Sequence, residues 1–598
     1  MATQQNGTLS GAPTMGKAAE SAGWPRTDRP LKVALIGWAR LSSQAWEGSG
    51  YNLSASELAR GLVLSGHEVS YLQSGMSYGL VGGPRVRHRE TWGGVRCYEL
   101  MNSPNLSTSF MNFRNVETEI RCPEESALVI RWLDEIGAQL VHVHSMEGYS
   151  LDMIAAIRGS GRPVVVTPHN YHFVCPQVDL LHQEARVCED YDGGRRCENC
   201  LPEAPLPGPA RRKRAIGQTF ERTLGPYAAD VVRKAVYGVP ATVRRAFRGE
   251  FHKGWKAPVL NPDRLLDPEL SLGFERVSVR GEQTGAEDGL VHHDLPLQPH
   301  EKPKEYDSAP LEQNERMLAT RDRHLTVLNN YGKRRAAGVA ALNEASLVIP
   351  PSDFLRRLHV TMGVDESRTR LVRLGQPHFD QINRRARRSP FYDTPPWNPA
   401  SARRPLRFAF YGTVRANKGL EVLARAIPLL ERGVRERCQI IIRAGGYEWP
   451  FRKRLSLYPQ VSVYGAYDLY QLIAGAGEYD VGLLPHIWLE NSPLVMLEHL
   501  HAGKFVVASR LGGPPDWIVP PRNGMLFAAG DAAQLADCLT KLVRGEVALP
   551  TPRQVHEATV LRSYPSHVRE VEGIYHEVLG ATTRQRTVDA ARSLAPSA

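Results

Sequence analysis

Short apolar runs alternate with helix-like segments along most of the chain. The first run, residues 31–37, ends in glycine and is typical of a buried parallel strand. Residues 51–63 carry apolar side chains at helical spacing, and residues 68–72 again have the pattern of a strand. Because strand and helix patterns recur over residues 139–167, we expect the first domain to contain a parallel α/β sheet.

A second series of the same kind begins at Leu406. It follows residues 384–405, which are rich in proline and arginine, lack periodicity and are interpreted as an interdomain linker. The sequence therefore predicts an α/β fold in which two doubly wound, Rossmann-like domains face a cleft. The strand-like runs of the second series are residues 406–411, 439–442, 461–464, 481–484 and 505–508.

A chain of 598 residues is too long for one hydrophobic core, which stops growing near ~300 residues. Residues 202–313 carry many prolines and charges and little periodicity, so we interpret them as a long irregular insertion in the first domain, partly disordered. The predicted divisions are a disordered leader (1–30), an N-terminal acceptor domain (31–383), the linker (384–405), a C-terminal donor domain (406–575) and a tail (576–598).

Composition and charge limit the class of protein to which the chain can belong. With 42% hydrophobic and 23% charged residues the chain has ordinary globular usage, which argues against wholesale disorder or a fibrous repeat. No stretch approaches the ~20 apolar residues of a membrane span, and the leader lacks the apolar core of an export signal. We therefore expect a cytoplasmic protein, in which cysteines are free thiols or metal ligands rather than disulfides.

The net charge of +11 is concentrated in one segment. Between Arg211 and Lys256 there are twelve Lys or Arg against three Asp or Glu. Such a segment could hold the protein on the anionic inner face of a membrane or meet an anionic acceptor. The alternative is a solvated surface insertion, and we do not expect nucleic acid as the partner.

Residues 488–503 are the most informative passage for function. Ser492 followed by Pro493 predicts a helix start, with serine as the N-cap and proline in the first helical position. The free N–H groups of that turn and the helix dipole suit a diphosphate. Glu490 comes just before the helix and Glu498 about a turn and a half into it, so two carboxylates flank the anion site.

This passage resembles the E-x7-E region of the retaining GT-B glycosyltransferases of family 4. The resemblance implies that Glu490 contacts the donor sugar and that Glu498 holds the ribose hydroxyls. It also assigns the diphosphate to the helix start, formed by Asn491, Ser492, Pro493, Leu494 and Val495.

Flanking segments extend the resemblance over about residues 31–201 and 340–575. Residues 504–518 and 523–531 are similar to the strand, double-glycine turn and closing element of that family. In the first loop of the C-terminal domain Lys418 matches a phosphate-binding lysine. Thr413 stands where the family often has a basic residue, and Arg415 is the suggested substitute.

Four residues of the first domain are implied in the same way. Gly48 and Gly50 lie where the family has a glycine-rich loop near the donor phosphates. His144 ends a strand at the carboxyl edge of the sheet and matches a catalytic histidine, and His169 resembles a second histidine of the cleft. The alternative for each histidine is a core or loop-stabilising role, and a lone G-x-G is common by chance.

Four cysteines, which we call the cysteine cluster, have the spacing C-x12-C-x8-C-x2-C. Four thiolates with a closing C-x-x-C suit a structural zinc ion, whereas unligated thiols, a disulfide or an iron–sulfur role are the alternatives. The cluster consists of Cys175, Cys188, Cys197 and Cys200.

The resulting hypothesis is a retaining glycosyltransferase that moves a sugar from a UDP- or GDP-linked donor to a hydroxyl acceptor of glycan, glycolipid or glycoside synthesis. No carboxylate stands out as a covalent nucleophile, so Lys418, Glu490 and His144 are expected to act by positioning and charge stabilisation, without a catalytic metal. Two alternatives are a weak or inactive transferase-like protein that binds nucleotide-sugar or a partner, and a nucleotide-sugar epimerase on the same fold.

Overall fold

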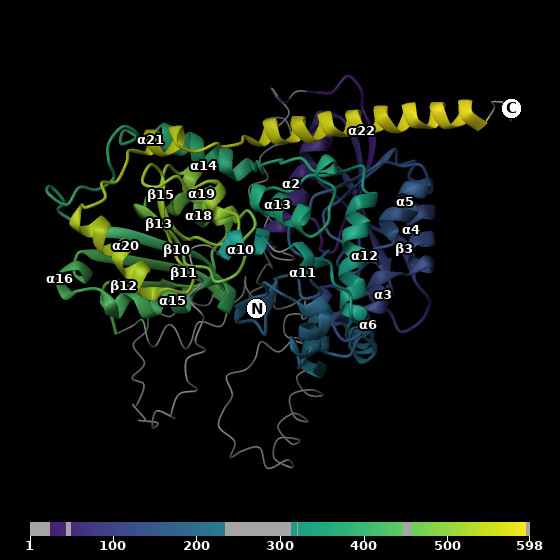
Figure 1. Cartoon of the computed structure of the whole chain (residues 1–598), viewed down its shortest axis with the longest axis horizontal. Coiled ribbons are helices and arrows are strands. Elements are labelled where there is room, and N and C mark those ends of the chain that lie inside the picture. The colour runs from purple at the N-terminus through teal and green to yellow at the C-terminus, as the bar shows by residue number, and fades with distance from the viewer. Residues whose placement is uncertain are drawn as a thin grey trace, which may run out of the picture.

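The structure is a computed structural model that describes residues 24, 26–42, 49–233, 313–319, 321–446, 455 and 457–593. Most of the predicted leader, Gly48, and most of the predicted insertion (residues 234–312) lie outside the described residues. Figure 1 shows two α/β domains side by side, with a long C-terminal helix that runs over the N-terminal domain.

The N-terminal domain is built on a seven-stranded sheet in the order β3-β4-β2-β1-β5-β6-β9. All neighbouring strands are parallel except the β3–β4 pair, an antiparallel hairpin at one edge. Apolar side chains cover both faces of the sheet, as a parallel sheet between helices requires. The strands are β1 (Lys32–Gly37), β2 (Glu68–Gln73), β3 (Arg85–Trp92), β4 (Val95–Met101), β5 (Leu140–Val143), β6 (Val164–Val166) and β9 (Leu347–Val348).

Local sequence explains where several helices of this domain begin. The Asn329 side chain accepts hydrogen bonds from the backbone N–H groups of Tyr331 and Gly332 at the start of α12, and Ser352 caps α13 through the N–H of Leu355. The helices are α2 (Ser49–Ser65), η1 (Ser109–Asn112), α3 (Glu117–Ile120), α4 (Pro123–Glu135), α5 (Met153–Gly159), α6 (Pro207–Arg233), α10 (Gln313–Ala319), α11 (Arg321–Leu325), α12 (Asn330–Glu344), α13 (Asp353–Thr361) and η5 (Glu366–Arg368).

The C-terminal domain contains a six-stranded, all-parallel sheet in the order β12-β11-β10-β13-β14-β15. Its strands are β10 (Leu406–Val414), β11 (Cys438–Gly446), β12 (Val461–Tyr464), β13 (Val481–Leu484), β14 (Phe505–Ser509) and β15 (Gly524–Phe527). Its helices are η6 (Ala416–Lys418), α15 (Leu420–Ala426), η7 (Ile427–Leu429), α16 (Arg432–Arg435), α18 (Leu469–Gly475), α19 (Leu494–His501), η8 (Pro514–Asp516), α20 (Ala532–Arg544) and α21 (Pro552–Glu557).

The last helix, α22 (Tyr564–Ser593), returns to the N-terminal domain. Val568, Ile574 and Tyr575 belong to the apolar cluster that covers one face of the N-terminal sheet. The hydroxyl of Tyr575 also lies 2.7 Å from Nδ1 of the buried His142 on β5. The predicted C-terminal domain of residues 406–575 therefore extends too far, because α22 packs on the other domain and continues through most of the predicted tail.

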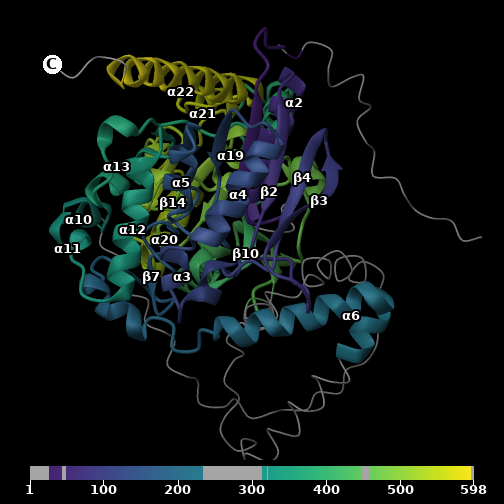
Figure 2. The ribbon, with the colours of Figure 1, turned by 90° about the vertical axis from the view of Figure 1, so that its right-hand side faces the viewer.

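Two further segments are more regular than the sequence indicates. The helix α14 (Pro377–Arg387) occupies the first residues of the predicted linker. The start of the predicted insertion is α6, which Figure 2 shows along the edge of the molecule opposite α22. Arginines dock this helix: Arg211 donates to the backbone oxygen of Pro104 at 2.9 Å, and Arg214 donates to that of Ser107 at 2.5 Å.

Candidate active site

The two glutamates of the E-x7-E region lie on either side of the start of α19. Glu490 is in the loop after β13, and Glu498 is in the helix itself. The helix begins at Leu494 with Pro493 as N-cap, so the prediction that Ser492 caps it is wrong by one residue. The shift arises because Pro493 has extended backbone angles (φ −64°, ψ 119°) instead of helical ones.

The first turn of α19 still presents backbone donors. The N–H of Met496 bonds to the oxygen of Pro493 at 3.0 Å, whereas the N–H groups of Leu494 and Val495 precede this first bond of the helix. The hydroxyl of Ser492 is buried beside them and has no hydrogen-bond partner among the described residues. Together with the helix dipole, these groups suit an anionic ligand.

Lys418 and Glu490 form the charged centre of the site. Lys418 Nζ lies 2.5 Å from Glu490 Oε1 and 4.9 Å from the centre of the Trp488 ring. Burial raises the pKa of Glu490, but the charges of Lys418 and His486 outweigh burial and leave that pKa below its usual value. Glu490 is therefore ionised at neutral pH, and the pair brings one cation and one anion to the cleft.

Two glycines permit this arrangement. Gly419 adopts a left-handed conformation (φ 72°), and a Cβ atom there would collide with the backbone oxygen of Pro485 at the end of β13. A Cβ atom on Gly512 (φ 73°) would likewise collide with the backbone oxygen of Glu490, at 2.2 Å. Only glycine tolerates both a positive φ angle and such a close backbone contact. Glycine at these two positions therefore allows the Lys418 loop and the double-glycine turn to pack directly against the Glu490 loop.

Glu498 is held by a histidine that the sequence analysis did not identify. Its Oε1 lies 3.0 Å from Nε2 of His378, the second residue of α14, and its buried Oε2 has no partner among the described residues. A buried carboxylate oxygen without a partner is costly, so Oε2 is well suited to accept a hydrogen bond from a ligand hydroxyl. His378 follows a proline that marks a helix start, but nothing in the sequence links it to Glu498.

The N-terminal domain contributes Gly50, Tyr51 and two histidines. A Cβ atom on Gly50 would lie 3.0 Å from Leu494 Cδ1, so the first turn of α2 directly abuts the first turn of α19. His144 Nδ1 lies 3.0 Å from His169 Nε2, and Tyr51 stacks on His169 with 6.2 Å between ring centres. The structure thus brings the predicted histidines together; Tyr51, their neighbour, was not predicted.

Both histidines are neutral. Burial, with a smaller contribution from other histidines, lowers the pKa of His144 well below its usual value and that of His169 to about 3. His144 Nε2 is buried without a hydrogen-bond partner among the described residues. A neutral imidazole with one free nitrogen can donate or accept a hydrogen bond, depending on its tautomer.

Asn491 bridges the two domains rather than exposing its side chain. Its Oδ1 accepts a hydrogen bond from Ser352 at 2.5 Å, and its Nδ2 donates to the backbone oxygen of His169 at 3.2 Å. A second bridge runs from the Tyr171 hydroxyl to the backbone oxygen of Leu489 at 2.8 Å. The predicted diphosphate role of Asn491 is therefore limited to its backbone.

The charges of Arg415 and Asp179 interact. Arg415 is exposed and precedes η6, while Asp179 is half-buried in the loop after β6. Burial outweighs the opposing charges of Arg415 and Lys418 and, together with the charge of Glu490, raises the pKa of Asp179 to about 6. Asp179 thus shares the electrostatic environment of the site, although its loop has no sequence pattern that singles it out.

The cysteine cluster lies in the same loop as His169 and Asp179. All its members are free thiols that line one small cavity. Within the described residues, no three His, Cys, Asp or Glu side chains stand in positions that would hold a metal ion. The four thiols are thus gathered without being arranged as ligands.

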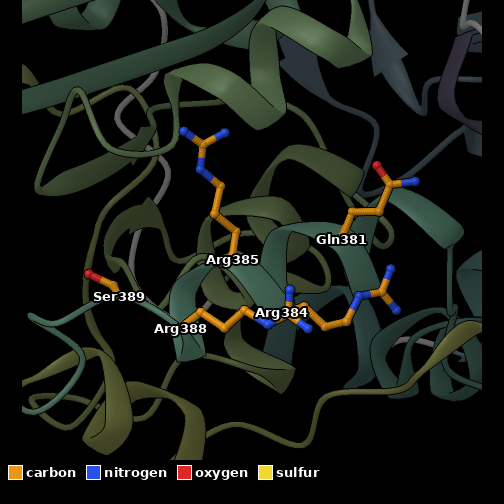
Figure 3. A pocket seen from close by; sticks show the side chains of 5 residues that line it. All are labelled: Gln381, Arg384, Arg385, Arg388 and Ser389. Atoms are coloured by element: carbon orange, nitrogen blue, oxygen red, sulfur yellow. The ribbon is translucent and has the colours of Figure 1, made fainter. Parts of the chain in front are cut away.

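A separate open pocket of about 530 Å³ contains none of the predicted site residues. It lies at the C-terminal end of α14, where three arginines and a glutamine project from the helix (Figure 3). The residues that line it are Gln381, Arg384, Arg385, Arg388 and Ser389.

Two family models match the chain. Residues 405–545 match the model described as Glycosyl transferases group 1, and residues 49–233 match the one described as Glycosyl transferase 4-like domain. Two Rossmann-like domains with these matches define a glycosyltransferase of the GT-B architecture, and the chain is such an enzyme. The second match reaches the end of α6, so the resemblance extends beyond residue 201, where the sequence analysis placed its limit.

Solved structures with similar folds have low sequence identity. Anabaena HepE in complex with UDP and glucose is 11% identical (TM-score 0.47), and sucrose-phosphate synthase from Thermosynechococcus elongatus is 13% identical (TM-score 0.48). The trehalose-phosphate synthase (UDP-forming) of Burkholderia xenovorans is 10% identical (TM-score 0.46). Each alignment covers 92% of this chain and 100% of the other. A search of curated proteins gave no match.

None of the helices in the described part of the chain combines the length and the apolar character that crossing a bilayer demands.

Proposed function

We propose that the chain is a retaining glycosyltransferase that transfers a sugar from a UDP- or GDP-linked donor to an acceptor hydroxyl. The observation that carries this proposal is the meeting of three groups in the cleft: the Lys418–Glu490 pair, the first turn of α19, and the neutral histidines of the N-terminal domain. The family matches favour a transferase over an epimerase or a binding protein without activity.

The donor would lie along α19. The N–H groups of Leu494 and Val495 and the cations Lys418 and Arg415 suit the diphosphate. The free Oε2 of Glu498, further along the helix, suits the ribose hydroxyls. The ionised Glu490 would then accept hydrogen bonds from the sugar, next to the lysine that stabilises the departing phosphate.

The reaction would proceed on one face of the sugar. The bond between the anomeric carbon and the diphosphate oxygen breaks, the bond to the acceptor oxygen forms, and the acceptor proton passes to the departing phosphate. The enzyme's part is to position the two substrates and to stabilise the growing negative charge with Lys418, Arg415 and the helix start, without a catalytic metal. His144 would orient the sugar through its free Nε2.

The test is turnover of a panel of UDP- and GDP-sugars in the presence of EDTA, with the anomeric configuration of the product determined by NMR. Lys418→Ala should lower kcat at least ~100-fold, because a preorganised charge on the leaving group is lost. The matched control is Lys541→Ala, which removes a lysine paired with Asp537 at 2.7 Å on the surface of α20. An inverted product would refute retention, and a fully active Lys418→Ala would refute the proposed role.

A lipid-linked acceptor at an anionic membrane surface is a further part of the proposal. Arg214 of α6 is buried and Arg211 half-buried, but Arg212 and Lys213 are exposed, as are Phe220 (44%) and Leu224 (50%). A helix face with both basic and apolar side chains suits an interface with anionic lipid.

Flotation with vesicles of anionic and of neutral lipid tests this surface. The wild-type protein should float only with anionic vesicles, and the double variant Phe220→Ser/Leu224→Ser should not float. Val560→Ser, which changes a residue that is 71% exposed elsewhere, serves as control. No flotation of the wild-type protein would reject the membrane part and leave the transferase part intact.

A further inference from the structure

The double-glycine turn, residues 511–513, follows β14 and lies against the backbone of Glu490. A Cβ atom on Gly512 would collide with both the oxygen and the nitrogen of Glu490, so the two backbones are in direct contact. The N–H of Gly513 also donates to the oxygen of Glu490 at 2.6 Å. The position of the double-glycine turn therefore determines the position of the Glu490 backbone.

A side chain of the N-terminal domain binds this turn at two points. Asn314 Nδ2 donates to the backbone oxygen of Gly512 at 2.8 Å, and Asn314 Oδ1 accepts a hydrogen bond from the N–H of Gly512, also at 2.8 Å. Asn314 is only 7% exposed, so water has little access to these bonds. An amide presents a donor and an acceptor side by side, as neither a carboxylate nor an alkyl side chain does.

The helix α10, which Figure 1 shows where the two domains meet, fixes Asn314 in the N-terminal domain. Met317, three residues later, is fully buried in the apolar cluster of that domain. Arg316 Nη2 lies 2.7 Å from Glu189 Oε1, which also accepts a hydrogen bond from Gln313 Nε2 at 2.9 Å. Glu189 belongs to the loop after β6, whose short elements are β7 (Leu181–His182), β8 (Arg186–Val187) and η2 (Asp192–Asn199).

Within the C-terminal domain, His486 binds the same turn. Its Nε2 lies 2.9 Å from the backbone oxygen of Leu511, and its Nδ1 lies 3.0 Å from that of Leu484 at the end of β13. Burial lowers the pKa of His486, although the charge of Glu490 opposes this, so the imidazole is neutral. A neutral imidazole donates to only one of the two oxygens, whereas Asn314 makes both of its bonds to the turn.

We propose that Asn314 is a positioning residue for sugar transfer, which holds Glu490 in place through the double-glycine turn. The inference rests on the proposed function, in which Glu490 contacts the donor sugar. Lys418 fixes the carboxylate of Glu490, and Asn314 fixes its backbone through Gly512. The N-terminal domain thereby shapes the donor site of the C-terminal domain without contacting the donor.

Donor kinetics of Asn314→Ala give the first test. We expect kcat to fall at least ~10-fold, because a displacement of catalytic groups by about 1 Å costs up to ~100-fold in rate. The donor KM should stay within about threefold of the wild-type value, since the start of α19 and Glu498 keep their positions.

The matched control is Asn343→Ala. Asn343 Nδ2 donates to the backbone oxygen of Gly363 at 3.0 Å, and its Oδ1 accepts a hydrogen bond from the N–H of Asp365 at 2.8 Å. The control thus removes two similar bonds to the backbone from α12 and should leave kcat unchanged.

The variant Asn314→Asp separates positioning from structural damage. A protonated carboxyl again presents a donor and an acceptor side by side, whereas the ionised carboxylate cannot donate to Gly512. Burial should raise the pKa of this aspartate, as it raises that of Glu147 to about 7. The ratio of variant to wild-type kcat should therefore rise as the pH falls from about 8.5 to about 6.5, and the ratio for Asn314→Ala should stay constant. A ratio for Asn314→Asp that does not change with pH would contradict the proposal.

Hydrogen exchange of the full-length protein without substrate provides an independent measurement. Peptides that contain residues 489–491 and 511–513 should exchange faster in Asn314→Ala than in the wild type, and at the wild-type rate in Asn343→Ala. Unchanged exchange in Asn314→Ala, or a kcat within about twofold of the wild-type value, would overturn the proposal. If Asn314→Ala does not fold, Asn314→Asp at about pH 8.5 takes its place in both measurements. If the wild-type protein turns over no donor, the proposed function fails, whereas the exchange rates still decide whether Asn314 holds the turn.

Discussion

At the scale of single residues, His378 positions Glu498 without being expected to touch the donor. It supplies the one hydrogen bond that the buried carboxylate has among the described residues. Removing one partner of a buried charge costs about 1–3 kcal/mol, so His378→Ala should raise the donor KM roughly tenfold and leave kcat within about twofold. Steady-state kinetics with the donor varied provides the measurement.

The conservative variant separates positioning from mere structural damage. In His378→Gln an amide nitrogen can replace Nε2, so the donor KM should return most of the way to the wild-type value. His88→Ala, which removes an exposed histidine of β3, is the control. A fall in kcat equal to the rise in KM, or no rescue by glutamine, would contradict a positioning role.

At the scale of elements, sequence patterns predict strands better than they predict contacts. The run at residues 481–484 coincides with β13, because a strand buried between two helical layers must be apolar throughout. The run at residues 461–464 coincides with β12, which lies at the edge of the sheet and is only partly buried. The strand β3 was not predicted, because it lies at the edge of the sheet and carries charged side chains such as Arg87 and Glu90. The helix α6 was not predicted either, because much of its packing depends on arginines that bind backbone oxygens rather than on an apolar stripe.

In the candidate active site, too, sequence patterns predict some residues and miss others. Lys418, Glu490 and Glu498 lie in motifs with a spacing that a sequence displays, and the structure places them around one helix start. His378 and Asp179 come from a distant helix and a loop, and only tertiary folding brings them to the cleft. No periodicity or capping pattern could have identified them.

At the scale of the whole molecule, buried histidines govern the response to acid. Burial holds ten described histidines in the neutral form, with pKa values well below 6.5, so only the unfolded chain takes up these protons as the pH falls. The free energy of unfolding then decreases with falling pH, at up to about 1.4 kcal/mol per pH unit for each group. The ten are His142, His144, His169, His172, His324, His359, His499, His501, His556 and His567.

Five carboxyls whose pKa burial raises act in the opposite direction but are outnumbered: Glu125, Glu147, Asp179, Asp380 and Asp516. Burial raises the pKa of Glu125 and Glu147 to about 7 and that of Asp179 to about 6, so the folded protein binds these protons first and gains stability as the pH falls toward 4.5. The net expectation is a steep loss of stability from pH 6.5 to 5.5, measured as the midpoint of urea unfolding at several pH values. His359→Leu removes one buried histidine of α13. The dependence of the free energy of unfolding on pH should therefore become less steep by the contribution of one histidine. A midpoint that stays constant or rises over this interval would mean that the histidines do not remain neutral in the fold.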